Sequence, residues 1–403
     1  MPTRAQVCAW TLGCGLVVPS QAVAQDRTER DVVDLIVREG PRAQAIRAES
    51  EVIRREQLAR LVHPNPGVTY SREGAGFTEF LQVEQSLPVF GTRAALSRAG
   101  AAATAAGEAE RDARLWVLRG DAAAAVARLT AVQARLDAAQ AHTRYVERLV
   151  AILRTREREG EGSRFDWLRA EQELRDARQL ATSAGVDVAE ARATVTAMLP
   201  RDVTLGRITP VAALQLVPAS VDALMTRALS TRAELRALLY SLERTDRESE
   251  AARRARLPAP TLFGGLKRAD DESGRDRGGV FGVSLSLPLF DAGGREAARW
   301  AAERARVEAE RASTEQQIRS EITRASEALA LRQAAVSEDV ETAGDELTQI
   351  AEVAYREGEV GILELLDAVR TASRARIRSI ELRLDARLAQ IALERAVGDV
   401  LWP

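Results

Sequence analysis

The chain has 403 residues, a net charge of −2 and 4% aromatic residues, although 46% of its residues are hydrophobic. Much of the hydrophobic fraction is alanine, and together with Arg, Glu and Leu this composition favours long helices and coiled coils over a large globular core. Positive and negative residues are interleaved, which excludes the one-sided basic surface typical of nucleic-acid binding.

The first 24 residues have the features of a secretory signal peptide. Arg4 supplies a positive charge, Val7–Val18 forms a short apolar run, and Ala22-Val23-Ala24 provides a small-x-small cleavage site. The apolar run is too short to cross a bilayer. We therefore expect residues 1–24 to be removed on export, with a buried N-terminal helix as an alternative.

Both cysteines of the chain, Cys8 and Cys14, lie inside this segment. The exported chain would therefore contain neither a disulfide nor a reactive thiol. Cys14 leaves a further alternative open, in which the exported protein is a lipoprotein attached through this residue. No later segment is long and apolar enough to predict a transmembrane helix, so a membrane crossing would need strands.

Residues 25–200 are predicted to form a first repeat of three parts. Apolar residues recur at helical spacing in the first part and alternate with polar residues in the second, which is typical of strands. The third part is rich in Ala, Arg and Glu and contains no proline before Pro200. We expect a helix over 28–62, a strand pair near 66–88, and a long helical hairpin over 93–199 that turns near 158–166.

Within this hairpin, twelve residues recur at alternating steps of three and four. They are Leu115, Leu118, Ala122, Ala125, Leu129, Val132, Leu136, Ala139, Thr143, Val146, Val150 and Leu153. This heptad pattern continues over five repeats and predicts a coiled-coil seam along one face of a single long helix.

Two short sequences occur once in each half of the chain. Ser86-Leu87-Pro88-Val89-Phe90 recurs as Ser286-Leu287-Pro288-Leu289-Phe290, and Arg158-Glu159-Gly160-Glu161 recurs as Arg356-Glu357-Gly358-Glu359. A duplication with this spacing indicates one structural unit used twice.

A mixed connector over 201–218 separates the first repeat from a second one over 219–403. The long helix of the second repeat has a looser seam, with apolar residues mostly seven positions apart. These are Trp300, Val307, Ile322, Leu329, Val336, Val340 and Leu347. We expect a helix over about 219–256, a strand pair near 260–288 whose strands are joined by an exposed polar loop at Ala269–Arg277, and a helical hairpin over 295–399 that turns near 356–364. The predicted fold is mostly α with a small β part, in which long antiparallel helical hairpins are duplicated and accompanied by four β-strands.

No catalytic constellation is apparent, and we expect neither an enzyme nor a bound cofactor. The two histidines, His63 and His142, have no spacing that would provide a metal site with a third ligand. We interpret the Arg- and Glu-rich runs as solvated helix faces with i,i+4 pairs.

The two hairpin turns are the most informative candidate sites. Glu364 and Asp367 follow the second turn and are three residues apart, so they share one helix face. Asp166 follows the first turn. Acidic residues at the start of a helix also complement its macrodipole, and this simpler explanation stays open.

The order of elements, occurring twice, resembles the outer-membrane efflux factors, the TolC-like family. The resemblance covers nearly the whole exported chain. It rests on the Leu-Pro-x-Phe sequences at 87–90 and 287–290, each followed by a Gly turn, and on Tyr355-x-x-Gly358 followed by Glu364-Leu365-Leu366-Asp367. It implies a homotrimer that forms an α-barrel tunnel topped by a twelve-stranded outer-membrane β-barrel, with four strands from each chain.

The resemblance also implies roles for individual residues. Glu364 and Asp367 match acidic positions that ring a pore constriction, and Tyr355 and Asp166 match positions that tie neighbouring helices shut. Val360 departs from the arginine that some members carry in that tie. The residues implied in docking an adaptor protein are Gly160, Phe165, Leu168, Gly358, Leu363 and Leu366. Those implied to face lipid are Leu81, Val83, Phe281, Val283 and Leu285.

We therefore expect the outer-membrane channel of a tripartite efflux or type I secretion system, which extends into the periplasm. It would conduct substrate passively from an inner-membrane pump and a periplasmic adaptor, with no nucleic-acid partner. The alternative is a periplasmic coiled-coil adaptor or structural scaffold protein.

Overall fold

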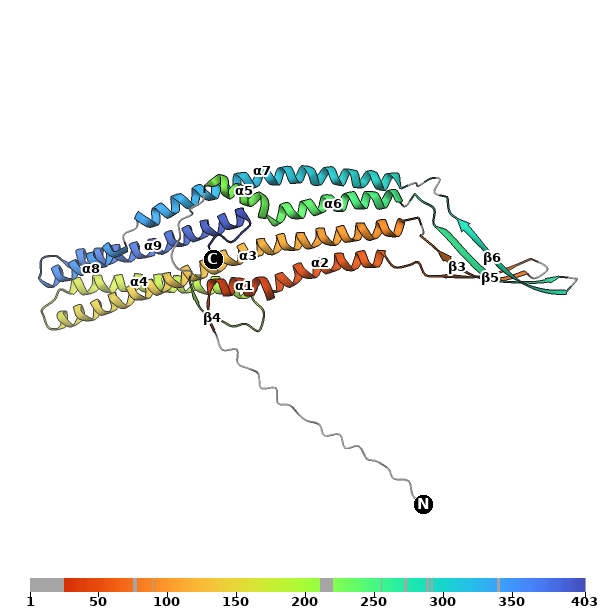
Figure 1. The fold of residues 1–403 in the computed structure, drawn as a ribbon. Coiled ribbons are helices and arrows are strands. Elements are labelled where there is room, and N and C mark those ends of the chain that lie inside the picture. The colour runs from red at the N-terminus through yellow and green to blue at the C-terminus, as the bar shows by residue number, and fades with distance from the viewer. Residues whose placement is uncertain are drawn as a thin grey trace, which may run out of the picture.

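The computed structural model describes residues 25–402, apart from residues 75–77, 89, 211–219, 255, 272–273, 288–289, 291–292 and 339–340. The predicted signal peptide and Cys14 lie outside the described residues. Figure 1 shows an elongated molecule, with a β-sheet at one end and helices that run lengthwise to two hairpin turns at the other end.

The same order of helices and strands occurs in both halves of the chain, except that the single helix α3 of the first half corresponds to two helices, α7 and α8, in the second. The first half contains β1 (Gln25–Thr28), α1 (Glu29–Glu39), α2 (Pro41–Arg60), β2 (Gly67–Glu73), β3 (Thr78–Ser86), α3 (Thr92–Arg158) and α4 (Arg164–Met198). The second half contains β4 (Leu205–Thr209), α5 (Val221–Thr231), α6 (Ala233–Arg254), β5 (Pro260–Asp271), β6 (Gly274–Leu285), α7 (Gly294–Glu338), α8 (Glu341–Arg356) and α9 (Ile362–Val397).

Helix α3 is the longest element, and it has 67 residues. At 1.5 Å per residue it is roughly 100 Å long. Leu118, Leu129 and Val146 of the predicted seam are fully buried, and none of the twelve seam residues is exposed. The seam contacts α4 near the hairpin turns, while other parts of α3 contact α2, α6 and α9.

Small residues set the spacing between α3 and its neighbours. Ala95 and Ala99 form a buried cluster with Ala251 of α6. A Cβ atom added to Gly107 would lie 2.9 Å from the Cδ1 atom of Ile53 on α2. Since a larger side chain at these positions would meet a neighbouring helix, the helices pack closely along their length.

The prediction of one helix over 28–62 is wrong, because the chain breaks at Gly40. Pro41 begins α2, where its missing N–H costs no hydrogen bond. A Cβ atom at Gly40 would lie 2.4 Å from the carbonyl oxygen of Ile36 and 2.6 Å from that of Met198. The break therefore brings the end of α1 against the end of α4.

A second break divides the helix predicted over 219–256 into α5 and α6. Arg232 lies between them and is 6% exposed. Its Nε donates to the carbonyl oxygen of Ala396 at 2.9 Å, and its guanidinium also pairs with Glu234 and Glu321. The break directs this cation inward, where it joins α5, α6, α7 and α9.

The second long helix is described as α7 and α8, and Val340 of the predicted seam lies outside the described residues. Trp300, Ile322 and Leu329 are buried as the seam predicts. Leu347 is 41% exposed, so the seam does not continue as a buried stripe into α8 within one chain.

The sheet is antiparallel, with the strand order β2-β3-β5-β6. The predicted loop over Ala269–Arg277 is wrong for the described residues, because β5 and β6 continue through it with Ala269 opposite Asp276 and Asp270 opposite Arg275. Backbone pairing continues here although the side chains are polar, since main-chain hydrogen bonds do not depend on apolar alternation.

The connector contains a strand that the sequence analysis did not identify. β4 pairs with β1 in parallel, and Leu205 and Ile208 join a core with Val32, Val33 and Ile36 of α1. Residues 211–218 of the connector lie outside the described chain.

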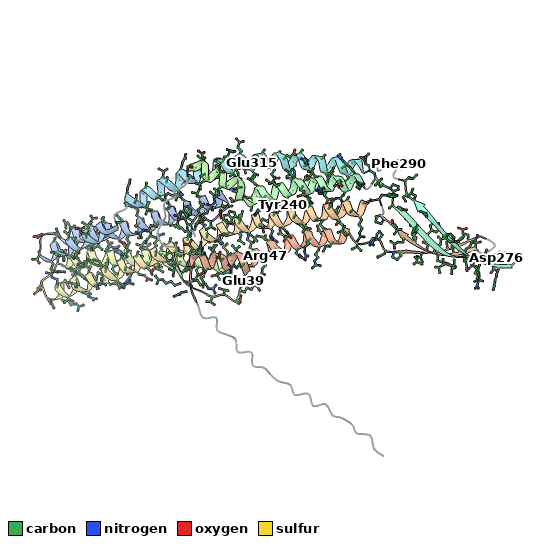
Figure 2. The ribbon with its side chains drawn as sticks, in the orientation of Figure 1. Glu39, Arg47, Tyr240, Asp276, Phe290 and Glu315 are labelled. Carbon is green, nitrogen blue, oxygen red and sulfur yellow. The ribbon has the colours of Figure 1, made fainter. Side chains whose placement is uncertain are left out.

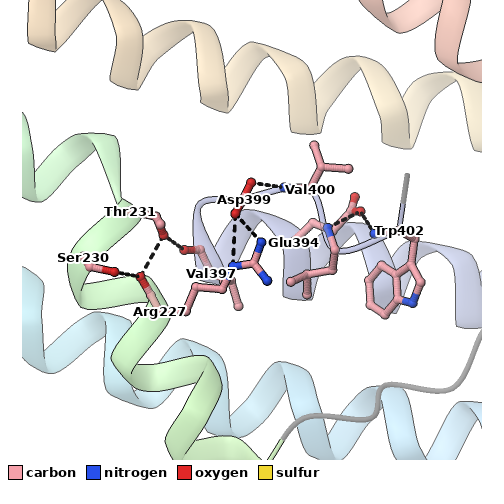
Figure 3. A network of polar contacts seen from close by, with 9 residues as sticks. Arg227, Ser230, Thr231, Glu394, Val397, Asp399, Val400 and Trp402 are labelled. Atoms are coloured by element: carbon pink, nitrogen blue, oxygen red, sulfur yellow. Dashed lines mark hydrogen bonds and ion pairs between the residues drawn. The ribbon is translucent and has the colours of Figure 1, made fainter.

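The C-terminus lies near the middle of the elongated molecule (Figure 1). Figure 3 shows the polar contacts that tie the last residues to α5 and α9. The carboxylate of Glu394 accepts hydrogen bonds from the backbone N–H groups of Leu401 and Trp402, at 3.1 and 3.2 Å. Arg227 pairs with Asp399. These contacts fix the end of the chain beside the junction of α5 and α6.

Candidate functional site

The two hairpin turns share one backbone geometry. Gly160 and Gly358 have φ angles of 78° and 79°, a left-handed conformation that favours glycine. After each glycine, a backbone N–H bonds back into the helix: Glu161 to the carbonyl of Arg156 at 2.9 Å, and Glu359 to that of Ala354 at 2.8 Å. The duplicated Arg-Glu-Gly-Glu sequence therefore forms the same helix end twice.

A hydrophobic cluster joins the two hairpins beside these turns. Its buried members are Val146, Leu149, Leu153, Ala170, Leu174, Ile362, Leu365, Leu366 and Val369. They come from α3, α4 and α9, so the first and second hairpins share one core at this end of the molecule. We call this group the tip core.

The six residues proposed to dock an adaptor differ in exposure. Phe165, Leu168 and Leu363 are 61%, 45% and 49% exposed, and both turn glycines are exposed. Leu366 is 2% exposed and belongs to the tip core, so its proposed role as a surface contact is contradicted. Its position on α9 faces α3 and α4, because it follows the buried Ile362 by one helical turn.

Glu364 and Asp367 are both exposed at the start of α9. Glu364 lies in the first turn of the helix, where a negative charge complements the macrodipole. Asp367 lies close enough to Arg370 that its charge contributes to raising the pKa of that guanidinium, after the larger effect of Glu173. The two carboxylates are available to a neighbouring chain or to solvent.

Tyr355 and Asp166 lie near each other across the two hairpins. Partial burial raises the pKa of Tyr355, and the negative charge of Asp166 raises it further. No hydrogen bond joins the two side chains in the described structure. Val360, at the position where the resemblance implies an arginine in some members, is only partly buried beside the second turn.

A second link between the hairpins was missed by the sequence analysis. Glu173 of α4 is 5% exposed and pairs with Arg370 of α9, whose Nε lies 3.4 Å from its Oε1. The Nε2 atom of His142 on α3 lies 3.9 Å from the same Oε1. Burial lowers the pKa of His142, and the charge of Arg370 lowers it further, whereas Glu173 opposes the shift.

The only signal for this link in the sequence is the position of Glu173. It follows Ala170 by three residues and precedes Ala177 by four, and both alanines are buried on the inner face of α4. The interpretation of Arg- and Glu-rich runs as solvated helix faces does not hold for this buried glutamate, because its partner comes from the distant α9.

At the other end of the molecule, one face of the sheet is apolar and exposed. Leu81, Val83, Phe281, Val283 and Leu285 are 48%, 50%, 88%, 65% and 48% exposed. The strand register adds Val68, Tyr70, Leu262 and Leu266 to this face. We call these nine residues the apolar face. The opposite face carries Gln82, Glu84 and Ser284, together with Phe80, Phe263 and Val280.

Among the described residues, no helix combines the length and apolar composition needed to cross a lipid bilayer. In the same part of the chain, His, Cys, Asp and Glu side chains form no group of three or more that could hold a metal ion.

Residues 65–200 and 224–399 match the family model of the outer membrane efflux proteins. The chain belongs to this family. The matched segments contain both strand pairs and both helical hairpins, and membership confirms the resemblance and the expected location in the outer membrane. It does not favour the alternative of a periplasmic adaptor or scaffold.

Solved structures of outer-membrane channels have the same fold. The open state of the MtrE channel from Neisseria gonorrhoeae has a TM-score of 0.71 at 18% identity, with 93% of this chain and 89% of that chain covered. The CmeC channel from Campylobacter jejuni has a TM-score of 0.71 at 13% identity, with 93% and 87% covered. VceC from Vibrio cholerae has a TM-score of 0.68 at 17% identity, with 92% and 96% covered. A comparison with curated protein sequences found no match.

Proposed function

We propose that three copies of this efflux protein assemble around one axis into a continuous tunnel. The observation that carries this proposal is the exposed apolar face of a sheet with two free edges. In the described structure β2 and β6 each pair on one side only. Unpaired strand edges are not tolerated in lipid, and a closed barrel is the β-structure that pairs every strand. Three copies of four strands would give twelve, closed by pairing β6 of one copy with β2 of the next.

The extent of the apolar face along the sheet, and the aromatic residues at its two ends, support a lipid contact. On β5 the apolar face extends from Leu262 to Leu266. Phe90 and Phe290 lie at the end nearer the helices and are 49% and 102% exposed. Tyr70 lies toward the other end. Aromatic residues on both sides of an apolar band are typical of outer-membrane barrels.

The helices also expose apolar residues that a neighbouring copy would cover. Leu347, Ile350 and Val353 of α8 are 41%, 60% and 49% exposed, on a helix whose other face contacts the tip core through Ala351 and Tyr355. An exposed apolar stripe of this kind indicates a partner surface. In the proposed trimer this stripe would contact the first hairpin of the next copy.

We also propose that the hairpin turns form a periplasmic constriction. Three copies of Glu364 and Asp367 around the axis would concentrate negative charge at the mouth and attract cations. Movement of the second hairpin away from the first would open the mouth, and an adaptor docked on Phe165, Leu168 and Leu363 would favour that movement. An inner-membrane pump would then deliver substrate, which the tunnel conducts passively.

The test uses the full-length protein extracted from outer membranes in detergent. We expect a particle three times the mass of one chain, and discrete ion-conducting steps after insertion into planar lipid bilayers. Val83→Arg, on the apolar face, should reduce insertion, whereas Gln82→Arg, on the opposite face, should not. A water-soluble monomer without channel activity would contradict the proposal.

A further inference from the structure

One row of the sheet places four charged side chains on the same face as the apolar residues. In the strand register, Arg72 lies opposite Glu79, Glu79 opposite Arg268, and Arg268 opposite Arg277. The next row toward the helices contains Tyr70, Leu81, Leu266 and Gly279. Because residues two apart on a strand share a face, the charged row directly continues the apolar face.

This charged row has an excess of positive charge. An NH1–Oε2 distance of 3.9 Å separates Arg268 from Glu79, and its NH2 lies 3.7 Å from Asp270. Arg277 is exposed and forms no ion pair with any described residue. One row farther out, Arg275 pairs with Asp270 at 3.2 Å. On this face, the charged row and the row beyond it carry four arginines and two acidic residues, Glu79 and Asp270, a balance of +2 per chain, whereas Glu73 and Asp276 lie on the opposite face.

The position of the row matches a membrane boundary. It lies toward the end of the sheet that is distant from the helices, which Asp276 marks in Figure 2. The hydroxyl of Tyr70 donates to the Oε1 atom of Glu79 at 3.3 Å, so its ring lies in the apolar rows while its polar end reaches the charged row. Tyrosine has this orientation where hydrocarbon meets lipid headgroups.

The opposite face of the sheet differs at the same level. There the row consists of Ser71, Phe80, Lys267 and Gly278, and the single cation, Lys267, lies over the Phe80 ring at 5.6 Å from its centroid. Solubility alone does not require the arginines of a hairpin to lie on one face. Here the arginines lie on the face that also carries the exposed apolar residues.

We propose that Arg72, Arg268 and Arg277 bind phosphate groups of lipid headgroups in the outer leaflet of the outer membrane. Guanidinium groups match phosphate with two parallel hydrogen bonds and carry a permanent charge. Within the row, Glu79 lies between Arg72 and Arg268 and orients the guanidinium of Arg268. The inference rests on the proposed function, because it requires the apolar face to contact lipid.

The test measures lipid retained by the full-length assembly in native mass spectrometry. The probes are bisphosphorylated lipid A, the same lipid without its phosphates, and inorganic phosphate. We expect retention of the bisphosphorylated lipid only. The variant Arg72→Gln/Arg268→Gln/Arg277→Gln should weaken it by about tenfold or more, because charge-assisted bonds are lost. Arg277→Gln alone, which breaks no ion pair in the described chain, should act in the same direction.

Lys267→Gln, on the opposite face, is the matched control and should retain lipid as the unmodified protein does. Equal retention by the triple variant, equal loss in the Lys267 control, or equal binding of the dephosphorylated lipid would each overturn the inference. An environment-sensitive label on Val83→Cys, reconstituted in phosphatidylcholine vesicles, separates the two proposals. If the label lies in hydrocarbon while the triple variant retains lipid, only phosphate binding fails. If the label lies in water, the proposed membrane contact also fails.

Discussion

Arg370 on α9 forms an ion pair with Glu173 on α4, 197 positions earlier in the chain. The pair connects the two helical hairpins beside the tip core, and the carboxylate of Glu173 is almost fully buried. The resemblance implies an arginine tie in some family members at the position of Val360, whose side chain carries no charge. The Arg370–Glu173 pair supplies a cation–anion link between the same two hairpins from another position.

Replacing Arg370 by Met should destabilise the tip because Glu173 would be left buried without its cation. We expect a loss of about 1.5–3 kcal/mol, since Arg370 is partly exposed and water would reach part of the site. The measurement is guanidinium unfolding of the detergent-solubilised protein. The double variant Glu173→Gln/Arg370→Met should recover part of the loss. Arg178→Met, which breaks an exposed pair with Glu147, should cost less than about 1 kcal/mol. Similar losses in the two single variants would argue against a special role for the buried pair.

The stability of the tip should fall as the pH decreases, because His142 resists protonation in the folded chain. Its folded pKa is lowered below the ordinary value of 6.5, mainly by burial. Below pH 6.5 the unfolded chain therefore binds a proton that the folded chain resists, so stability is lost from about pH 6.5 downward to the folded pKa. His142→Gln should remove this part of the pH dependence. If stability depends on pH in His142→Gln as it does in the unmodified protein, this histidine is not the source of the pH dependence.

Removing the acidic residues at the proposed constriction should change ion conduction. Glu364→Ala/Asp367→Ala should reduce cation preference and block by divalent cations in single-channel recordings, since six carboxylates would be lost from a trimer. Glu357→Ala/Glu359→Ala removes the same number of charges from the second turn and is the control. Unchanged selectivity and unchanged divalent block in the first variant would contradict a charged ring at these positions.

The exposed and buried leucines of the tip should have separate effects. Leu363→Ser should weaken adaptor binding in a pull-down assay with little change in stability, because Leu363 is 49% exposed. Leu366→Ser should destabilise the fold by about 2–5 kcal/mol, because it leaves a cavity and a hydroxyl in the tip core. Reduced adaptor binding only in the unstable variant would contradict the assigned docking surface.

Gly40 and Gly185 offer a matched pair for testing the break between α1 and α2. Gly40→Ala should cost about 1–3 kcal/mol, because its Cβ would overlap the carbonyl oxygens of Ile36 and Met198. Nothing lies within 4 Å of a Cβ at Gly185, which is inside α4, so Gly185→Ala should stabilise the protein by about 0.5–1 kcal/mol. Thermal unfolding in detergent distinguishes the two signs, and a neutral Gly40 variant would contradict the close approach.

The repeating patterns in the sequence predicted those parts of the fold that depend on a single helix or strand. The heptad steps from Leu115 to Leu153 correspond to a helix over Thr92–Arg158 with a seam that is nowhere exposed. Alternation at Leu81, Val83, Phe281 and Val283 corresponds to one face of a sheet. Both patterns are strong because they repeat many times.

Features that depend on contacts between distant segments could not be predicted in the same way. The break at Gly40 depends on the carbonyl group of Met198, and the break at Arg232 depends on Glu321 and Ala396. Neither partner is visible in the local sequence. Likewise, nothing in the local sequence distinguishes Glu173 from other helix residues, and its burial depends on Arg370 of the distant α9. The local pattern groups Leu366 with the exposed Leu363, whereas the fold places it in the tip core against α3 and α4.

The alanines that line α3 have a consequence for the width of the proposed tunnel. Ala95 and Ala99 pack against Ala251, with Leu96 beside them, so the small methyl groups at this contact fix the distance between the two helices. Around a closed ring of helices, the sum of these interhelical distances sets the diameter of the tunnel. Exchanging methyl groups for larger side chains would enlarge the circumference, and with it the greatest diameter of molecule that the tunnel admits.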